Sequence, residues 1–88
     1  MKWEFDFRLV RKQIRALPKQ VAMDILRALT PLGEDPRRSD CNIKALPGYT
    51  DRYRLRVRSY RVIYDVIDDQ VIIRLVSVGH RREAYRSM

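Results

Sequence analysis

Hydrophobic and polar positions alternate over the first seven residues, MKWEFDF, where every aromatic side chain falls on the same side. This period of two predicts a first strand. The spacing then changes to three or four residues, which predicts a short amphipathic helix that ends near Pro18. The apolar residues of this helical stripe are Phe7, Val10, Ile14 and Leu17.

A second helical stripe follows Pro18, which suits the first turn of a helix because proline lacks the N–H that would be unpaired there. Pro31 and Gly33 are expected to end this helix. The residues predicted to form its buried face are Val21, Ile25, Leu26, Leu29 and Leu32.

The second half of the chain returns to strand patterns. GEDPRRSDCN reads as a loop, and NIKALPGYTD holds a short extended piece before a turn at Pro47 and Gly48. Three strands are predicted, over residues 53–58, 60–66 and 71–78. Tight turns at 58–59 and 68–69 leave room only for antiparallel hairpins.

The predicted order is one strand, two helices and three strands, which indicates an α+β fold. We expect the amino-terminal strand and the two-helix hairpin to pack on one face of a mainly antiparallel sheet of about four strands. The 88 residues suffice for a single domain, 1–88. The other face of the sheet is then left for function.

The ten residues RYRLRVRSYR, from Arg52 to Arg61, hold the densest charge of the chain and contain no acid. Side chains on a strand alternate between faces, so Arg54, Arg56 and Arg58 are predicted to share the open face. Arg61 joins them if the apolar residues of the next strand turn toward the core. The pattern predicts a surface that binds an anion, with a solvated outer face as the alternative.

The formal net charge is +8 and the isoelectric point is near 10.3. Nucleic acid is the leading partner, because clustered cations displace the counterions condensed on phosphate. An acidic protein or an anionic membrane surface would also match this charge. No apolar run approaches the roughly 20 residues that span a bilayer.

The single cysteine, Cys41, cannot form an intramolecular disulfide, and no signal peptide is evident, which predicts a cytoplasmic protein. One cysteine, one histidine and scattered carboxylates lack metal-ligand spacing, so no metal or other cofactor is expected. Cys41 lies in a polar stretch far from His80 and is interpreted as a small loop residue.

The segment YRLRVRSYRVIYDVIDDQVIIRLVSVGHRREAY resembles the carboxy-terminal half of RelE-type toxins of the RelE/ParE toxin-antitoxin superfamily. The signature YRVIYxVxD, an apolar strand and then VGHRRxxY carry this resemblance. It implies a RelE-like fold and an mRNA interferase, an endoribonuclease that cuts mRNA in the ribosomal A site. It also implies an acidic, RelB-like antitoxin that binds the toxin in a hetero-oligomer.

The resemblance places the catalytic positions of the family on five residues of this chain: Arg54, Arg56, Arg61, Arg81 and Tyr85. Arg61, Arg81 and Tyr85 match the family residue types, whereas the best-known members carry lysines at the positions of Arg54 and Arg56. Arginine is a poor general base, so the base of this chain is not identified by the match.

Four further residues are candidates for RNA binding: Lys44, Arg58, His80 and Arg82. Ordinary surface charge explains the three cations equally well. Histidine has the best unperturbed pKa for proton transfer near neutrality, but a lone histidine beside arginines is more often a phosphate or backbone contact.

Two other functions remain open at this point. A ParE-like protein shares the fold and inhibits DNA gyrase without nuclease activity, although the combination of Arg61, Arg81 and Tyr85 favours the ribonuclease. A non-catalytic RNA-binding module is the third reading.

Overall fold

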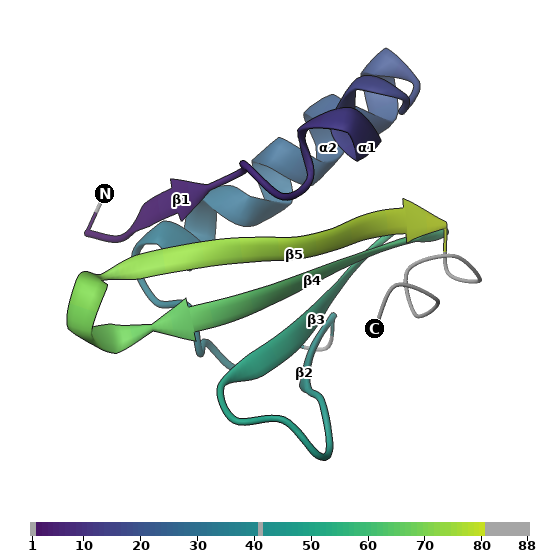
Figure 1. The fold of residues 1–88 in the computed structure, drawn as a ribbon. Helices are drawn as coiled ribbons and strands as arrows, with labels where there is room; N and C mark the ends of the chain where they lie inside the picture. Colours follow the sequence, from purple (N-terminus) through teal and green to yellow (C-terminus); the bar gives the residue numbers. More distant parts are fainter. Residues whose placement is uncertain (1, 41, 81–88) are drawn as a thin grey trace.

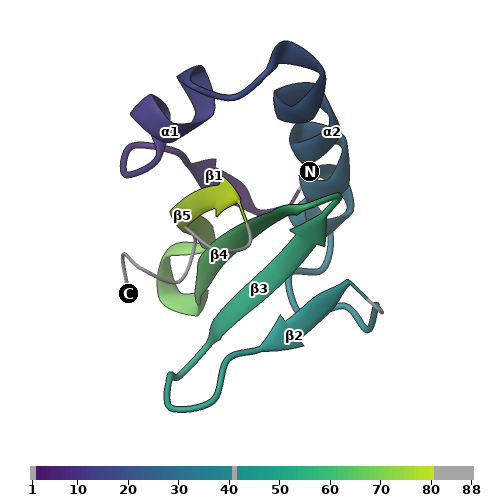
Figure 2. The same ribbon diagram turned by 90° about the vertical axis from the view of Figure 1, so that its right-hand side faces the viewer.

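Both helices lie on one face of a twisted five-stranded sheet, and no helix of the described part of the chain covers the other face, here called the open face (Figures 1 and 2). This computed structural model describes residues 2–40 and 42–80. The elements are β1 (Glu4–Asp6), α1 (Arg11–Arg15), α2 (Lys19–Leu29), β2 (Ile43–Ala45), β3 (Arg52–Val57), β4 (Tyr60–Ile67) and β5 (Ile72–His80). Short 3₁₀ helices cover Thr30–Gly33 and Asp68–Gln70.

The strand order is β1-β5-β4-β3-β2, and the predicted α+β class is confirmed. The hairpins β2–β3, β3–β4 and β4–β5 are antiparallel, as expected, whereas β1 runs parallel to β5. The number of strands is five rather than about four, because the short extended piece before Pro47 pairs with β3 as β2. None of the helices in the described part of the chain is long and apolar enough to cross a membrane.

The two helices follow the predicted stripes, with one exception. Pro18 precedes α2 with φ −53° and so directs the chain into the helix, and Pro31 falls in the 3₁₀ turn that follows. Leu26 was expected on the buried face of α2, but 47% of its surface is exposed. Leu26 instead lines a groove between α1 and α2, together with Phe7 and Ile14.

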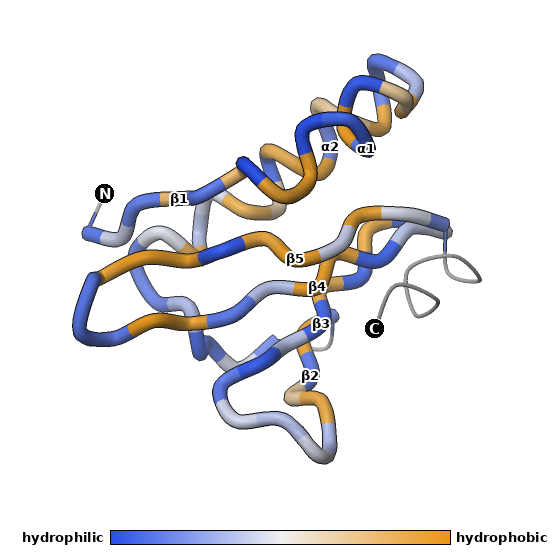
Figure 3. The backbone as a smooth tube through the Cα atoms, in the orientation of Figure 1, coloured by the Kyte–Doolittle hydropathy of each residue, from blue (hydrophilic) through white to orange (hydrophobic). Residues whose placement is uncertain are grey.

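The core lies between the helices and the sheet, and Figure 3 shows the hydrophobic stretches of α2 and β5 that meet there. The alternation predicted for β3 and β4 is confirmed, since Leu55, Val62 and Tyr64 are buried in this core. Tyr64 also stacks on Tyr53 and donates a hydrogen bond of 3.0 Å to the Pro36 carbonyl. The core residues from the helical half are Val10, Val21, Ile25, Leu29 and Leu32.

The turn between β3 and β4 corrects one expectation. Strand β3 ends at Val57, and Arg58 adopts a left-handed conformation with φ +56° in a two-residue turn. Its side chain therefore leaves the alternation of the strand and forms an ion pair of 2.7 Å with Asp24 of α2. The prediction that Arg58 shares the face of Arg54 and Arg56 is wrong, because the turn redirects it toward the helices.

Candidate anion-binding face

The open face of the sheet carries a row of alternating charges at one end. Asp65 of β4 lies opposite both Arg52 of β3 and Arg74 of β5, and Arg74 in turn lies opposite Asp6 of β1. Arg52 binds Asp65 through two hydrogen bonds of 2.7 and 2.9 Å. Arg74 reaches Asp6 at 3.1 Å. This end of the face is electrically balanced.

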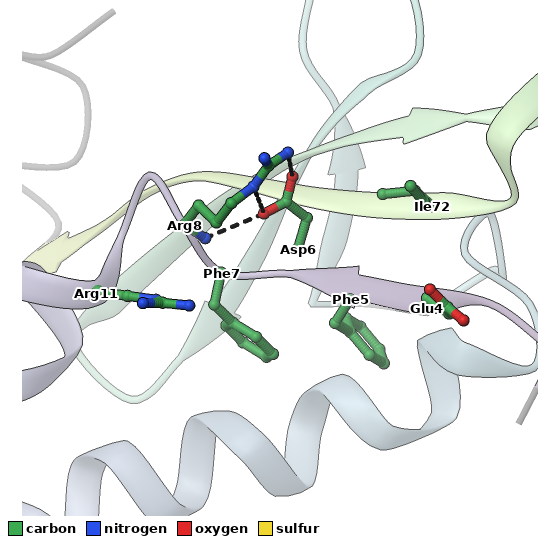
Figure 4. A pocket seen from close by; sticks show the side chains of 7 residues that line it. All are labelled: Glu4, Phe5, Asp6, Phe7, Arg8, Arg11 and Ile72. Atoms are coloured by element: carbon green, nitrogen blue, oxygen red, sulfur yellow. Dashed lines mark hydrogen bonds and ion pairs between the residues drawn. The ribbon is translucent and has the colours of Figure 1, made fainter.

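Asp6 is the most strongly held carboxylate of this row. Arg8 donates to it from both its side chain and its backbone N–H, as Figure 4 shows, and Arg74 donates from the other side. These hydrogen bonds, led by the Arg8 side chain, hold the pKa of Asp6 well below its ordinary value of 3.8. The charged form is thus the one that the fold favours.

Acid should therefore weaken the fold through Asp6. A carboxylate with a lowered pKa in the folded state contributes stability above its unfolded pKa, and this stability is lost as the pH falls below about 4. We expect Asp6→Asn to be less stable than the parent at pH 7 and to lose less stability on acidification. Urea unfolding at a series of pH values measures both effects. Asp69→Asn is the control, since Asp69 has no ion pair with any residue the structure describes, and equal acid sensitivity of Asp6→Asn and the parent would contradict the assignment.

Two arginines outside the face are also neutralised by carboxylates. Arg37 binds Asp51 at 2.9 Å and Asp68 at 2.7 Å, which ties three loops together, and these two carboxylates raise its pKa. Arg58 is held by Asp24, as described above. These residues serve the fold through ion pairs that the structure shows directly.

The other end of the open face holds cations without such partners. Lys44 of β2 lies directly opposite Arg54 of β3, and Arg56 of β3 lies directly opposite Arg61 of β4. These four residues, here called the open-face cluster, have no carboxylate within ion-pair distance among residues 2–40 and 42–80. Like charges directly opposite each other destabilise a sheet, so the cluster is not explained by folding.

Burial makes the open-face cluster still less favourable for the stability of the fold. Arg54 and Arg61 are each partly buried, and the Nε–H of each is shielded from water without a hydrogen-bond acceptor in the described part of the structure. A buried donor without an acceptor is unfavourable by about 1–3 kcal/mol. Ile63, which lies directly opposite Arg54 and two residues after Arg61 in β4, is fully buried on this face. The cluster is thus a set of donors whose charge the described part of the chain does not neutralise.

The predicted site residues fall into three groups. Arg54, Arg56 and Arg61 come together as expected, and Lys44 joins them. His80 ends β5 opposite Tyr60, and its ring meets the Tyr60 ring edge-on at 5.8 Å on the helix side of the sheet, so it points away from the cluster. Cys41 and the remaining candidates Arg81, Arg82 and Tyr85 lie outside the described residues.

A groove between α1 and α2 forms a second notable surface. It has a volume of about 320 Å³ and is lined by Phe7, Ile14 and Leu26, with Arg11 and Arg15 at its rim. The hollow drawn in Figure 4, of about 350 Å³, continues it along the edge of β1, since Phe7 and Arg11 line both. Phe5 and Phe7 stack there with their ring centroids 6.0 Å apart. The groove between α1 and α2 is apolar with a cationic border, whereas Glu4 and Asp6 also line the hollow beside β1.

Comparison with known proteins now identifies the family. The family model for the ParE toxin of type II toxin-antitoxin systems matches residues 7–85 of this chain. The chain belongs to this toxin family. Its sequence is 32% identical to the mRNA interferase toxin RelE of Escherichia coli K12, over 92% of this chain and 83% of that protein. The RelE-type resemblance seen in the sequence is confirmed.

Solved structures of this toxin family share the fold. The isolated E. coli RelE toxin matches with a TM-score of 0.73 and 34% identity, over 89% of this chain and 81% of that chain. The toxin in the E. coli RelBE toxin-antitoxin complex matches with a TM-score of 0.72 and 35% identity, over 89% and 93%. The archaeal RelE-RelB complex from Pyrococcus horikoshii gives a TM-score of 0.75 at 28% identity, over 96% and 100%.

Proposed function

We propose that this chain is the toxin of a type II toxin-antitoxin system and an mRNA interferase that cleaves mRNA in the ribosomal A site. The observation that carries the proposal is the open-face cluster, in which adjacent strands present arginines that no described carboxylate neutralises. The mRNA interferase name of the E. coli relative supports it. The proposed domain is the single RelE-like unit 1–88, and a ribosomal substrate implies a cytoplasmic location.

Arginine suits the charge that develops in metal-free RNA cleavage. Attack of the 2′-hydroxyl oxygen on the adjacent phosphorus forms a pentacoordinate phosphorane with additional negative charge on its oxygens. The planar guanidinium donates two hydrogen bonds to such oxygens and keeps its charge at every accessible pH. We assign this stabilisation to Arg61, with Arg81 as its proposed partner, because preorganised donors lower the barrier most.

Arg54 and Arg56 are proposed to bind the scissile phosphate and to complete the catalytic set with Tyr85. The Nε–H of Arg54, which has no acceptor among the described residues, lies on the same face as that of Arg61, on the neighbouring strand and two register positions away. Lys44, His80 and Arg82 are proposed as further RNA contacts. For Arg58, the ion pair with Asp24 leaves at most a peripheral contact with the RNA backbone.

A RelB-like antitoxin is the proposed protein partner. Structures of related toxins are complexes with RelB antitoxins, from E. coli and P. horikoshii. The groove between α1 and α2 offers an apolar floor and a cationic border, which match an amphipathic helix that carries acidic residues. We therefore place part of the antitoxin contact at Phe7, Ile14 and Leu26.

Incubation of the purified chain with RNA, with and without translating ribosomes, tests the function. We expect cleavage of ribosome-bound mRNA and an intact transcript when ribosomes are absent. Co-expression of the cognate antitoxin should suppress both the cleavage and the growth arrest. Intact RNA together with gyrase-linked DNA breaks would support a ParE-like inhibitor instead, and intact RNA without DNA damage would leave a passive RNA-binding protein.

A further inference from the structure

A third hollow, of about 450 Å³, lies where β5 ends beside α1. Its walls combine the aromatic rings of Tyr60 and His80 with the side chain of Gln13. The other lining residues, Ala16, Leu17, Val78 and Gly79, are small or apolar. A concave site that combines aromatic and apolar walls with a few polar groups is the usual form of a small-molecule site.

Gln13 has a defined orientation in this hollow. Strand β1 pairs only with Ile72–Arg74 of β5, so the edge of β5 beyond this pairing lacks a strand partner. Gln13 supplies one acceptor there, since its Oε1 receives a hydrogen bond of 2.6 Å from the Val78 N–H. A backbone N–H can donate to the oxygen of a side-chain amide but not to its nitrogen. The amide atom of Gln13 next to Val78 is therefore the oxygen. The Nε2 group therefore keeps two donors that are not used within the described residues.

Gly79 is a common neighbour of the hollow and of the open-face cluster. This residue lines the hollow and is also the direct register partner of Arg61. Gly79 adds no side chain to the open face beside Arg61, and Tyr60 is the residue immediately before Arg61 in β4. The hollow is thus lined by the residue before Arg61 in β4 and by the residue directly opposite Arg61 in β5, so a base next to a phosphate bound by Arg61 is near it.

We propose that this hollow is a nucleobase pocket, in which one base beside the scissile phosphate stacks on Tyr60 and accepts a hydrogen bond from Gln13 Nε2. Stacking on an aromatic ring tolerates every base, whereas a fixed donor favours a base that presents a carbonyl oxygen, such as the O4 of uracil or the O6 of guanine. The pocket would give the toxin a base preference at one position of the mRNA. This inference rests on the proposed ribonuclease function.

Abasic substitutions test the stacking. Ribosomes are programmed with mRNAs in which each A-site nucleotide in turn lacks its base, and single-turnover cleavage is measured with the full chain. In the parent, one abasic position should lower the rate by about tenfold, the typical contribution of one stacked base. In Tyr60→Leu the intact mRNA should be cleaved more slowly and this abasic penalty should disappear, whereas Tyr60→Phe should retain the penalty.

Gln13→Glu tests the donor. A carboxylate still accepts the Val78 N–H but carries no N–H of its own, so the preference should move from uracil and guanine toward the amino groups of adenine and cytosine. Lys12→Gln, on the same helix, lowers the net charge of the protein by the same one unit as Gln13→Glu. This control should change the rates evenly over the four bases.

Two results would overturn the pocket: an abasic penalty that is equal in the parent and Tyr60→Leu, or a Gln13→Glu variant with the parental order of bases. A chain that cleaves no RNA would refute the ribonuclease function and not the pocket. The same comparison of intact and abasic RNA is then made by fluorescence anisotropy with labelled hexanucleotides. Equal affinity for both RNAs in the parent would exclude base binding.

Discussion

Replacement of Arg61 by alanine should lower single-turnover cleavage on saturated ribosomes by about a hundredfold or more, the usual effect of removing one preorganised transition-state donor. The Arg61 Nε–H, like that of Arg54, is already desolvated without an acceptor among the described residues, so the fold holds it ready for an oxyanion. Arg61→Lys keeps the charge but loses the planar guanidinium, so its cleavage rate should lie between those of the parent and of Arg61→Ala. Quench-flow measurement of mRNA cleavage gives these rates.

The same replacement should leave the protein at least as stable as the parent. Arg61→Ala removes a buried donor that has no acceptor in the part of the chain that the structure describes, and it relieves the repulsion from Arg56 directly opposite. Slower cleavage with an unchanged or higher melting temperature is the combination expected of a functional residue, because a structural arginine would show the reverse.

Arg74→Ala is the matched control on the same face. Arg74 is engaged with Asp6, so its loss should reduce stability and leave the saturated cleavage rate near that of the parent. If Arg61→Ala cleaved as fast as Arg74→Ala, the assignment of Arg61 to the transition state would be wrong even though the fold is right.

The sequence alone predicts the strands and helices whose hydrophobic residues recur with a simple period. The alternation in RYRLRV placed Leu55 in the core and Arg54 and Arg56 on the open face, and the apolar set of β4 placed Arg61 beside them. Both inferences depend only on side-chain direction within a strand, which is local. The predicted α+β class follows in the same way, since the periods of two and 3.6 separate strands from helices.

Features that depend on distant parts of the chain were not accessible in this way. Arg58 continues the alternation in the sequence, but the turn and Asp24 of α2 redirect it. The apolar spacing around Leu26 shows a helical face but not that Leu26 lines a groove between α1 and α2 instead of the core. Gln13 appears as one more polar residue on an amphipathic helix, and only the unpaired edge of β5 shows what it binds.

Replacement of Leu26 by aspartate should weaken the binding of the antitoxin without slowing the cleavage of mRNA. Leu26 is nearly half exposed and lines the groove proposed for the antitoxin helix. It belongs to α2, which lies on the face of the sheet opposite the open-face cluster (Figure 1). A carboxylate there would be buried without a partner in the complex and would also repel an acidic helix. We expect the dissociation constant for the antitoxin to rise at least about thirtyfold, as for a central interface residue. The variant should still cleave ribosome-bound mRNA.

In cells this change should yield a toxin that its antitoxin no longer restrains. Co-expression should rescue growth with the parent chain but fail with Leu26→Asp. Leu9→Asp is the matched control, since Leu9 is 60% exposed and does not line the groove, and its rescue should be complete. Calorimetric titration of each chain with the antitoxin measures the affinities directly. Equal affinities for Leu26→Asp and Leu9→Asp would show that the antitoxin neutralises the toxin elsewhere, for example by covering the open-face cluster whose four cations lack described partners.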